Sequence, residues 1–325
     1  MARKTIGLWL PTRTSLSPIS VEAPGMWIEE LKIDFVTRLE RRGCFEIVDD
    51  LDFRRAHIRN GRVFLGDLDF SRLDLFFWFG EIDRGRDSFH IDLLEAIGER
   101  TIVINGAAPL RTALDKLQTQ LALVHQGLPV PDFMAVSRAN VAQIQERIGT
   151  KPYILKPRLG TFGIGITQVS SFDQLVDILD YSESEAHFLE ECIDCAPEDF
   201  IGINLIGGQI VSCYGKEPAK FRGWKVFDRN RCGGGLVSKA PLPEQARLAL
   251  EVSRVIPLDM MGIDMVRSRN TNTSYVIDVN SFPGLYPALN KACGHDIVQL
   301  FVELVERKLE LSPPQGRPVR AVAVD

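Results

Sequence analysis

The sequence predicts an α/β protein in which a parallel α/β lobe is followed by two α+β lobes. Apolar runs and amphipathic segments alternate through the first hundred residues, and strand pairs with separate helices follow them. The length of 325 residues also exceeds what one hydrophobic core usually serves. We therefore expect lobes at residues 1–107, 108–186 and 187–325.

The first lobe is predicted to hold a parallel sheet. Two segments have apolar residues at helical spacing, and each ends on a glycine, Gly43 or Gly98. Strand–helix alternation of this kind predicts parallel strands with right-handed crossovers. The expected strands are 6–10, 44–48, 73–81 and 101–105, and the expected helices are 27–43 and 88–98.

The second and third lobes are predicted to mix strands and helices. Gly127 closes one expected helix, and Gly207-Gly208 between two apolar runs is typical of a β-hairpin. In the second lobe we expect helices at 110–126, 139–148 and 172–181 and strands at 153–159 and 166–170. In the third we expect strands at 187–193, 261–268 and 274–282 and helices at 243–256 and 297–311.

The composition excludes several classes of protein. A net charge of −5, from 38 basic and 43 acidic side chains, argues against a nucleic-acid partner. No apolar run approaches the roughly 18 residues of a membrane span, so we expect a cytoplasmic protein without a membrane partner. Cys192 and Cys195 form a C-x-x-C pair, but without a second pair at zinc spacing we expect reduced thiols.

Lys156 and the glycines that follow it suggest a phosphate site. Lys156 ends an expected strand, and Gly160, Gly163 and Gly165 follow in a strand-to-strand loop. Backbone N–H groups of such a loop can surround phosphate oxygens while the lysine supplies positive charge. A plain glycine-rich hairpin turn is the alternative. We expect replacement of Lys156 to stop turnover without disturbing the core.

Polar residues in two late strands suggest a metal site. Asp278 and Asn280 are two residues apart, so they point to the same face of one strand, and Asp264 lies in the strand before it. Carboxylate and amide oxygens are ligands that magnesium accepts. The alternative is a set of hydrogen-bonded or solvated strand-end residues. Likewise, Lys116 could be a solvated helix residue, and Glu190 and Glu191 could lie on an exposed edge strand.

Five segments follow one another in a characteristic order. They are INGAAPLRTALDKLQTQL, ILKPRLGTFGIGI, FLEECI, GIDMV and VIDVNSFPG. In this order they resemble the ATP-grasp superfamily, and within it the RimK-type and glutathione-synthetase-type carboxylate–amine ligases. The resemblance covers residues 100–295 and implies an ATP-grasp fold, in which the two α+β lobes clasp ATP.

The resemblance implies a role for each matching residue. Two lysines match phosphate contacts, the glycine loop matches a flap over the triphosphate, and Glu190 and Glu191 match a hinge that holds adenine. Ile193 closes the hinge strand, and Asp199 or Glu198 matches the ribose ligand. The implied ATP site is Lys116, Lys156, Gly160, Thr161, Gly163, Gly165, Glu190, Glu191, Ile193 and Asp199. The implied ligands of Mg²⁺, or of Mn²⁺, are Asp264, Asp278 and Asn280.

The chain departs from the family pattern in three places, one of which is that the acidic residue matching the ribose ligand is displaced relative to its hairpin. The family usually has glutamate where this chain has Asp278. The basic motif before the glycines reads KVFDRNRCGGG, so either Arg229 or Arg231 matches the catalytic arginine. A shorter acidic side chain alters the reach to the metal but keeps the ligand chemistry.

The expected activity is therefore an ADP-forming carboxylate–amine ligase that works through an acylphosphate. The alternatives are an ATP-grasp kinase acting on a small-molecule hydroxyl and a non-catalytic nucleotide-binding protein. We expect small-molecule or peptide substrates and a homo-oligomer. Arg84 and Arg86 are candidates for binding a substrate carboxylate, although they also fit an exposed, salt-bridged loop.

Overall fold

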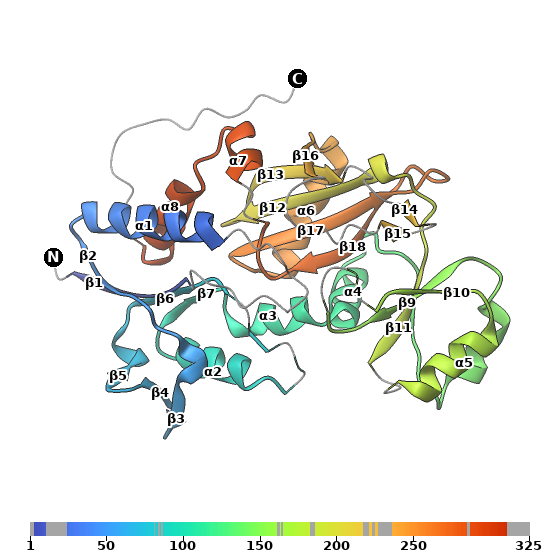
Figure 1. The fold of residues 1–325 in the computed structure, drawn as a ribbon, viewed down its shortest axis with the longest axis horizontal. Coiled ribbons are helices and arrows are strands. Elements are labelled where there is room, and N and C mark those ends of the chain that lie inside the picture. Colours follow the sequence, from blue (N-terminus) through green and yellow to red (C-terminus); the bar gives the residue numbers. More distant parts are fainter. Residues whose placement is uncertain are drawn as a thin grey trace.

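Three main sheets organise the chain (Figure 1). The structure is a computed structural model, and it describes residues 3–10, 25–80, 82–83, 85, 87–160, 163, 165–182, 186–216, 221–222, 225–226, 236–284 and 287–310. Among these residues, no helix combines the length and the apolar character needed to cross a membrane.

The amino-terminal sheet is parallel throughout, as predicted. Its order is β2-β1-β6-β7, formed by β1 (Lys4–Trp9), β2 (Phe45–Val48), β6 (Leu75–Trp78) and β7 (Ile102–Ile104). Helix α1 (Gly25–Arg41) connects β1 to β2, and α2 (Phe89–Gly98) connects β6 to β7. Strand β6 (LFFW) is apolar and fully buried, because helices cover the sheet on both faces.

A small antiparallel sheet interrupts this lobe and was not predicted. It comprises β3 (His57–Arg59), β4 (Arg62–Leu65) and β5 (Leu68–Asp69), flanked by the 3₁₀ turns η1 (Phe53–Arg55) and η2 (Phe70–Arg72). Asn60 and Gly61 join β3 to β4 with φ of 51° and 70°. Asn-Gly is the sequence signal for a two-residue hairpin turn of this kind, so the hairpin could have been found from sequence.

The single helix expected at 110–126 is wrong, because the structure breaks it at Asp115. Helix α3 (Ala107–Leu114) ends there, and α4 (Lys116–His125) begins at the next residue. Asp115 has an extended backbone, and its side chain accepts a hydrogen bond from the Leu117 N–H at 3.0 Å. An aspartate N-cap stabilises a new helix start. As a result, Lys116 is the first residue of α4.

The central sheet has the order β10-β9-β11-β8 and is antiparallel. Its strands are β8 (Phe133–Ala135), β9 (Tyr153–Pro157), β10 (Thr167–Val169) and β11 (His187–Glu191), and α5 (Phe172–Tyr181) packs on it. The helix expected at 139–148 is a 3₁₀ segment, η3 (Val141–Arg147). Strand β11, with which our predicted third lobe opens, pairs with β9 and β8 of this sheet. The lobe boundaries themselves stay a prediction.

The third sheet is antiparallel, with the order β16-β13-β12-β17-β18. Its strands are β12 (Phe200–Ile206), β13 (Gln209–Lys216), β16 (Leu236–Ser238), β17 (Met260–Arg267) and β18 (Ser274–Asn280). Gly207 and Gly208 join β12 to β13 with φ of 56° and 76°, which confirms the predicted hairpin. The remaining elements are η4 (Pro197–Asp199), β14 (Phe221–Arg222), β15 (Lys225–Val226), α6 (Pro243–Val255), α7 (Pro287–Ala292) and α8 (Ile297–Lys308).

Helix α8 and the buried Asn105 connect the amino-terminal lobe to the carboxy-terminal part of the chain. Helix α8 lies beside α1 in Figure 1, and its Phe301 ring packs 5.7 Å from Phe35 and 5.2 Å from Phe77 of the amino-terminal lobe. Asn105, fully buried after β7, donates to the carbonyls of Met260 and Ser281 at 2.8 and 2.5 Å. The strand that carries the candidate metal ligands is therefore fixed against the first lobe.

Candidate functional site

Four elements bring the predicted lysines and carboxylates together. Lys116 is the first residue of α4, Lys156 lies in β9, Glu190 in β11 and Asp278 in β18. These residues come from both α+β lobes and are up to 162 positions apart in the sequence. The predicted phosphate lysines and one predicted metal ligand thus share one site.

Lys116 and Asp278 form a direct ion pair. The Lys116 Nζ lies 2.8 Å from Oδ1 and 2.9 Å from Oδ2 of Asp278, and the two side chains are 12% and 23% exposed. Burial favours the neutral carboxyl group, but the charges of Lys116 and Lys156 outweigh it and hold the pKa of Asp278 below its usual value. Asp278 is therefore an anion at neutral pH.

Lys156 is buried against Glu190, with 5% and 2% of their side chains exposed. Its Nζ lies 2.9 and 3.1 Å from the two Glu190 oxygens and donates to the Ile277 carbonyl at 2.8 Å. Gln120 donates a further hydrogen bond to Glu190 at 3.0 Å. Burial raises the pKa of Glu190 despite the neighbouring lysine. The expectation that the core does not depend on Lys156 is therefore wrong.

The three candidate metal ligands lie on adjacent strands. Asp264 of β17 pairs directly with Asp278 of β18, and Asn280 follows two positions along β18. The Tyr214 hydroxyl reaches Asp264 Oδ1 at 3.4 Å. The Tyr214 ring lies over Gly202, where a β-carbon would be 2.2 Å from the ring, so only glycine leaves this space. Tyr214 thereby holds one oxygen of Asp264.

This donor set fits magnesium. Within the described residues no group of three or more His, Cys, Asp and Glu side chains could hold a metal. The candidate set instead offers two carboxylates and one amide, and magnesium typically takes one or two carboxylates together with phosphate and water oxygens. Phosphate or water oxygens would supply the remaining ligands of such an ion.

The glycine loop has the backbone that its sequence predicts. Gly160, Gly163 and Gly165 have φ of 146°, 65° and 80°. These values favour glycine because a β-carbon strains a left-handed backbone. The loop starts directly after β9 and so lies beside Lys156. Thr161 falls outside the described residues.

Comparison with known proteins decides the family. Residues 113–305 match the model of the RimK-like ATP-grasp domain. The chain belongs to the RimK-like ATP-grasp family. This confirms the predicted family and fold.

Named relatives of this ATP-grasp protein are ligases. It is 30% identical over 223 residues to a probable alpha-L-glutamate ligase of Parasynechococcus marenigrum, which covers 66% of this chain and 46% of that protein. It is 26% identical over 208 residues to the ribosomal protein bS6–L-glutamate ligase of Escherichia coli, which covers 63% of this chain and 67% of that protein. The chain thus spans about half the length of the first relative.

Solved ATP-grasp structures share the whole fold. The D-alanyl-alanine synthetase A of Vibrio cholerae superposes with a TM-score of 0.64 at 14% identity, over 95% of this chain and 99% of that one. The RimK domain protein of Sphaerobacter thermophilus gives a TM-score of 0.62 at 15% identity, over 93% and 99%. The amino-terminal lobe is therefore part of the shared architecture.

In this ATP-grasp protein, three residues predicted to contact adenine or ribose make contacts with other protein groups. Glu191 points away from Glu190 and pairs with Lys151 at 2.7 Å. Strand β11 ends at Glu191, so Ile193 does not close it, and Ile193 packs instead on the cluster of Phe200, Tyr214, Val266 and Leu289. Asp199 accepts from the Ala196 N–H at 2.7 Å, so its carboxylate caps a local turn.

Several predicted residues lie outside the described part of the chain. These are Thr161, Arg84, Arg86, Arg229 and Arg231. Their roles stay predictions. Cys192 and Cys195 are free thiols, in agreement with the expected reduced state, and burial raises the pKa of both.

The sequence analysis missed three residues of the ATP-grasp site. Gln120 bonds to Glu190, and Arg158 pairs with Asp115. Gln120 follows Lys116 by one helical turn, so helical spacing could have placed it on the same face. The N-cap preference of aspartate could have identified Asp115. Nothing in the local sequence identifies Arg158, because its partner is 43 positions away.

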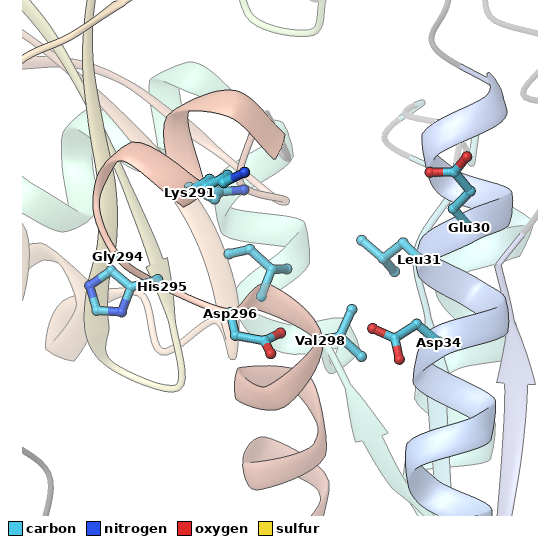
Figure 2. A pocket seen from close by; sticks show the side chains of 10 residues that line it. Glu30, Leu31, Asp34, Lys291, Gly294, His295, Asp296 and Val298 are labelled. Carbon is cyan, nitrogen blue, oxygen red and sulfur yellow. The ribbon is translucent and has the colours of Figure 1, made fainter.

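A cavity of about 620 Å³ lies apart from this site (Figure 2). Glu30, Leu31 and Asp34 of α1 face Lys291 and Asp296 at the junction of α7 and α8. Its walls contain both signs of charge and include none of the predicted ATP or metal ligands. The cavity borders the segment that follows β18, the strand that carries the candidate metal ligands Asp278 and Asn280.

We expect loop closure to depend on Gly165. A β-carbon at Gly165 would lie 2.9 Å from Pro157 Cγ, on a backbone with φ of +80°. Gly165→Ala should lower ATP turnover at least tenfold by preventing close approach to phosphate, a change of about 1.4 kcal/mol in barrier. Hydrogen exchange of residues 160–165 should slow when an ATP analogue and magnesium are added to wild type, and less in the variant.

Gly149→Ala is the matched control for this loop prediction. Gly149 also has a positive φ, 96°, but no atom lies within 4 Å of its virtual β-carbon. Both variants should lose about 1 kcal/mol of stability from backbone strain. Equal turnover in the two variants would show that residues 160–165 form a fixed turn. The same conclusion would follow if hydrogen exchange in this loop did not change when nucleotide is added.

Proposed function

We propose that the protein is an ATP-dependent ligase that joins a carboxylate to an amine and releases ADP and phosphate. The main support is that Lys116 and Lys156 both bind β18, at Asp278 and at the Ile277 carbonyl. A glycine loop with positive φ values lies beside them. Two cations, a glycine-rich loop and a pair of carboxylates suit a magnesium-bound triphosphate. No observation here favours the kinase alternative.

The proposed reaction follows from the charges in the site. A carboxylate is a poor electrophile, so its oxygen first attacks the γ-phosphorus of ATP, forming an acylphosphate and releasing ADP. The amine then attacks the acyl carbon, loses a proton, and expels phosphate as the amide forms. Lys116 and Lys156 balance phosphate charge, and Arg229 or Arg231 is the proposed donor to the tetrahedral oxyanion. Magnesium held by Asp264, Asp278 and Asn280 would neutralise the phosphates further.

Amino acids and peptide or protein ends are the proposed substrates. Relatives of the chain are named for glutamate and for a ribosomal protein. A cytoplasmic location and a homo-oligomer stay predictions.

A screen for phosphate release tests this proposal. Purified protein with ATP and magnesium is given pairs of amino acids and short peptides, and products are identified by mass spectrometry. We expect phosphate release that requires both substrates, and a product lighter than their sum by one water.

Other outcomes would reject parts of the proposal. A phosphorylated product without an amide would indicate a kinase, and tight ATP binding without turnover on any pair would indicate a nucleotide-binding protein.

A further inference from the structure

The first turn of α4 and the end of β9 are joined by a buried ion pair. The Arg158 Nε lies 3.1 Å from both Asp115 oxygens, and its Nη2 makes a second hydrogen bond to Oδ2. The side chains are 13% and 10% exposed, and 43 positions separate them. A bidentate arginine–carboxylate contact fixes the orientation of the two groups as well as their distance.

A main-chain hydrogen bond joins the same two segments. The Lys116 N–H donates to the Arg158 carbonyl at 2.9 Å. Asp115 also accepts from the N–H groups of Leu117 and Gln118, at 3.0 and 3.4 Å, so it caps α4 and binds Arg158 at once. The start of α4 is therefore fixed to the residue after β9 by side chain and main chain.

These contacts close a ring around the two phosphate lysines. Lys156 donates to a backbone carbonyl of β18, and the next residue of β18, Asp278, binds Lys116. Asp115 precedes Lys116 in the chain, and its partner Arg158 follows Lys156 by two residues. The ion pair and the Lys116–Arg158 backbone hydrogen bond thus join the two segments that carry the lysines, in addition to their contacts with β18.

We propose that Arg158 is a positioning residue, which holds Lys116 and Lys156 at the separation that the triphosphate requires and anchors the root of the glycine loop. The proposal rests on the proposed use of ATP at this site. Arg158 itself touches neither the metal ligands nor Glu190 among the contacts described. Its effect on the reaction passes through Asp115 and the backbone of Lys116.

The test compares Arg158→Ala with Arg158→Lys and with Arg111→Ala. Arg111 pairs with Asp92 and Glu95 at 2.8 and 2.7 Å on neighbouring helices, so its variant removes an arginine–carboxylate pair away from the lysines. Asp115 keeps its two backbone donors when Arg158 is truncated, so α4 should stay capped. We expect the melting temperature of Arg158→Ala to fall by only a few degrees.

Turnover is the first readout. Arg158→Ala should lower kcat/KM for ATP between about tenfold and a hundredfold, because misplaced reacting groups lose rate steeply. Arg158→Lys should lose less kcat/KM than Arg158→Ala but stay below wild type, since one ammonium cannot replace the bidentate contact of a guanidinium. Added guanidinium ion at millimolar concentration should restore activity to Arg158→Ala. Arg111→Ala should keep the wild-type kcat/KM.

Hydrogen exchange without nucleotide is the second readout, and it does not depend on activity. In Arg158→Ala, amides of residues 116–118 and 158–160 should exchange faster than in wild type, with other regions unchanged. The proposal is overturned if Arg158→Ala matches Arg111→Ala in both kcat/KM and local exchange, or if faster exchange spreads over the whole chain. If wild type shows no use of ATP, the proposed function fails, and the exchange readout still decides whether Arg158 fixes these segments.

Discussion

Lys156→Met should abolish ATP turnover and also destabilise the protein. Turnover should fall at least a hundredfold, because removing one charge from a site that stabilises transferring phosphate costs roughly 3 kcal/mol of barrier. Stability should fall by roughly 3–5 kcal/mol, because Glu190 would be left buried without its cation. Thermal melting and phosphate release measure the two effects on the same sample.

The double variant Lys156→Met/Glu190→Gln separates the two effects. Glutamine removes the unpaired negative charge and can still accept a hydrogen bond from Gln120, whose amide lies 3.0 Å from the Glu190 carboxylate. The double variant should regain most of the lost melting temperature and remain inactive. If it regains activity together with stability, Lys156 is only a structural partner of Glu190 and the phosphate assignment is wrong.

Asp278→Asn should weaken magnesium-dependent activity far more than binding of metal-free nucleotide. The substitution removes an anionic ligand at nearly constant shape and leaves Lys116 without its partner. We expect the magnesium concentration for half-maximal activity to rise at least tenfold. Mutating residues that only hydrogen-bond to metal ligands already lowers metal affinity or activity by roughly 10–100-fold. Asp278→Glu is the control, since it keeps the charge on a longer side chain. Equal magnesium dependence of Asp278→Asn and wild type would mean that Asp278 is structural.

The same variant has a defined pH signature. Lys116 and Lys156 hold the pKa of Asp278 below its usual value, so the ionised group stabilises the fold above about pH 4, the ordinary aspartate pKa. This contribution is lost as pH falls through the lower pKa of the folded state. The difference in melting temperature between wild type and Asp278→Asn should therefore be largest near neutral pH and shrink in acid.

Features set by neighbouring residues could be predicted from the sequence. The parallel strands of the first lobe, the Gly207-Gly208 hairpin and the alternation that puts Asp278 and Asn280 on one face all follow from local periodicity and turn chemistry. Two of the errors were also local: the break at Asp115 and the Asn60-Gly61 hairpin each have a sequence signal that was not used. The residue pattern also suggested Lys156, Asp278 and the other candidate metal ligands, and the family resemblance then added Lys116 and a role for each residue.

The sequence by itself determined the elements, the family and the residues that carry charge, and only the tertiary structure decided how those charges are paired. Lys156 binds Glu190 from 34 positions away, Arg158 binds Asp115 from 43, and Lys116 binds Asp278 from 162. Helices and strands follow from short-range backbone preferences, which a sequence displays directly. An ion pair depends on where separate strands and helices meet, and burial at that meeting point decides whether a lysine is a free surface charge or part of the core.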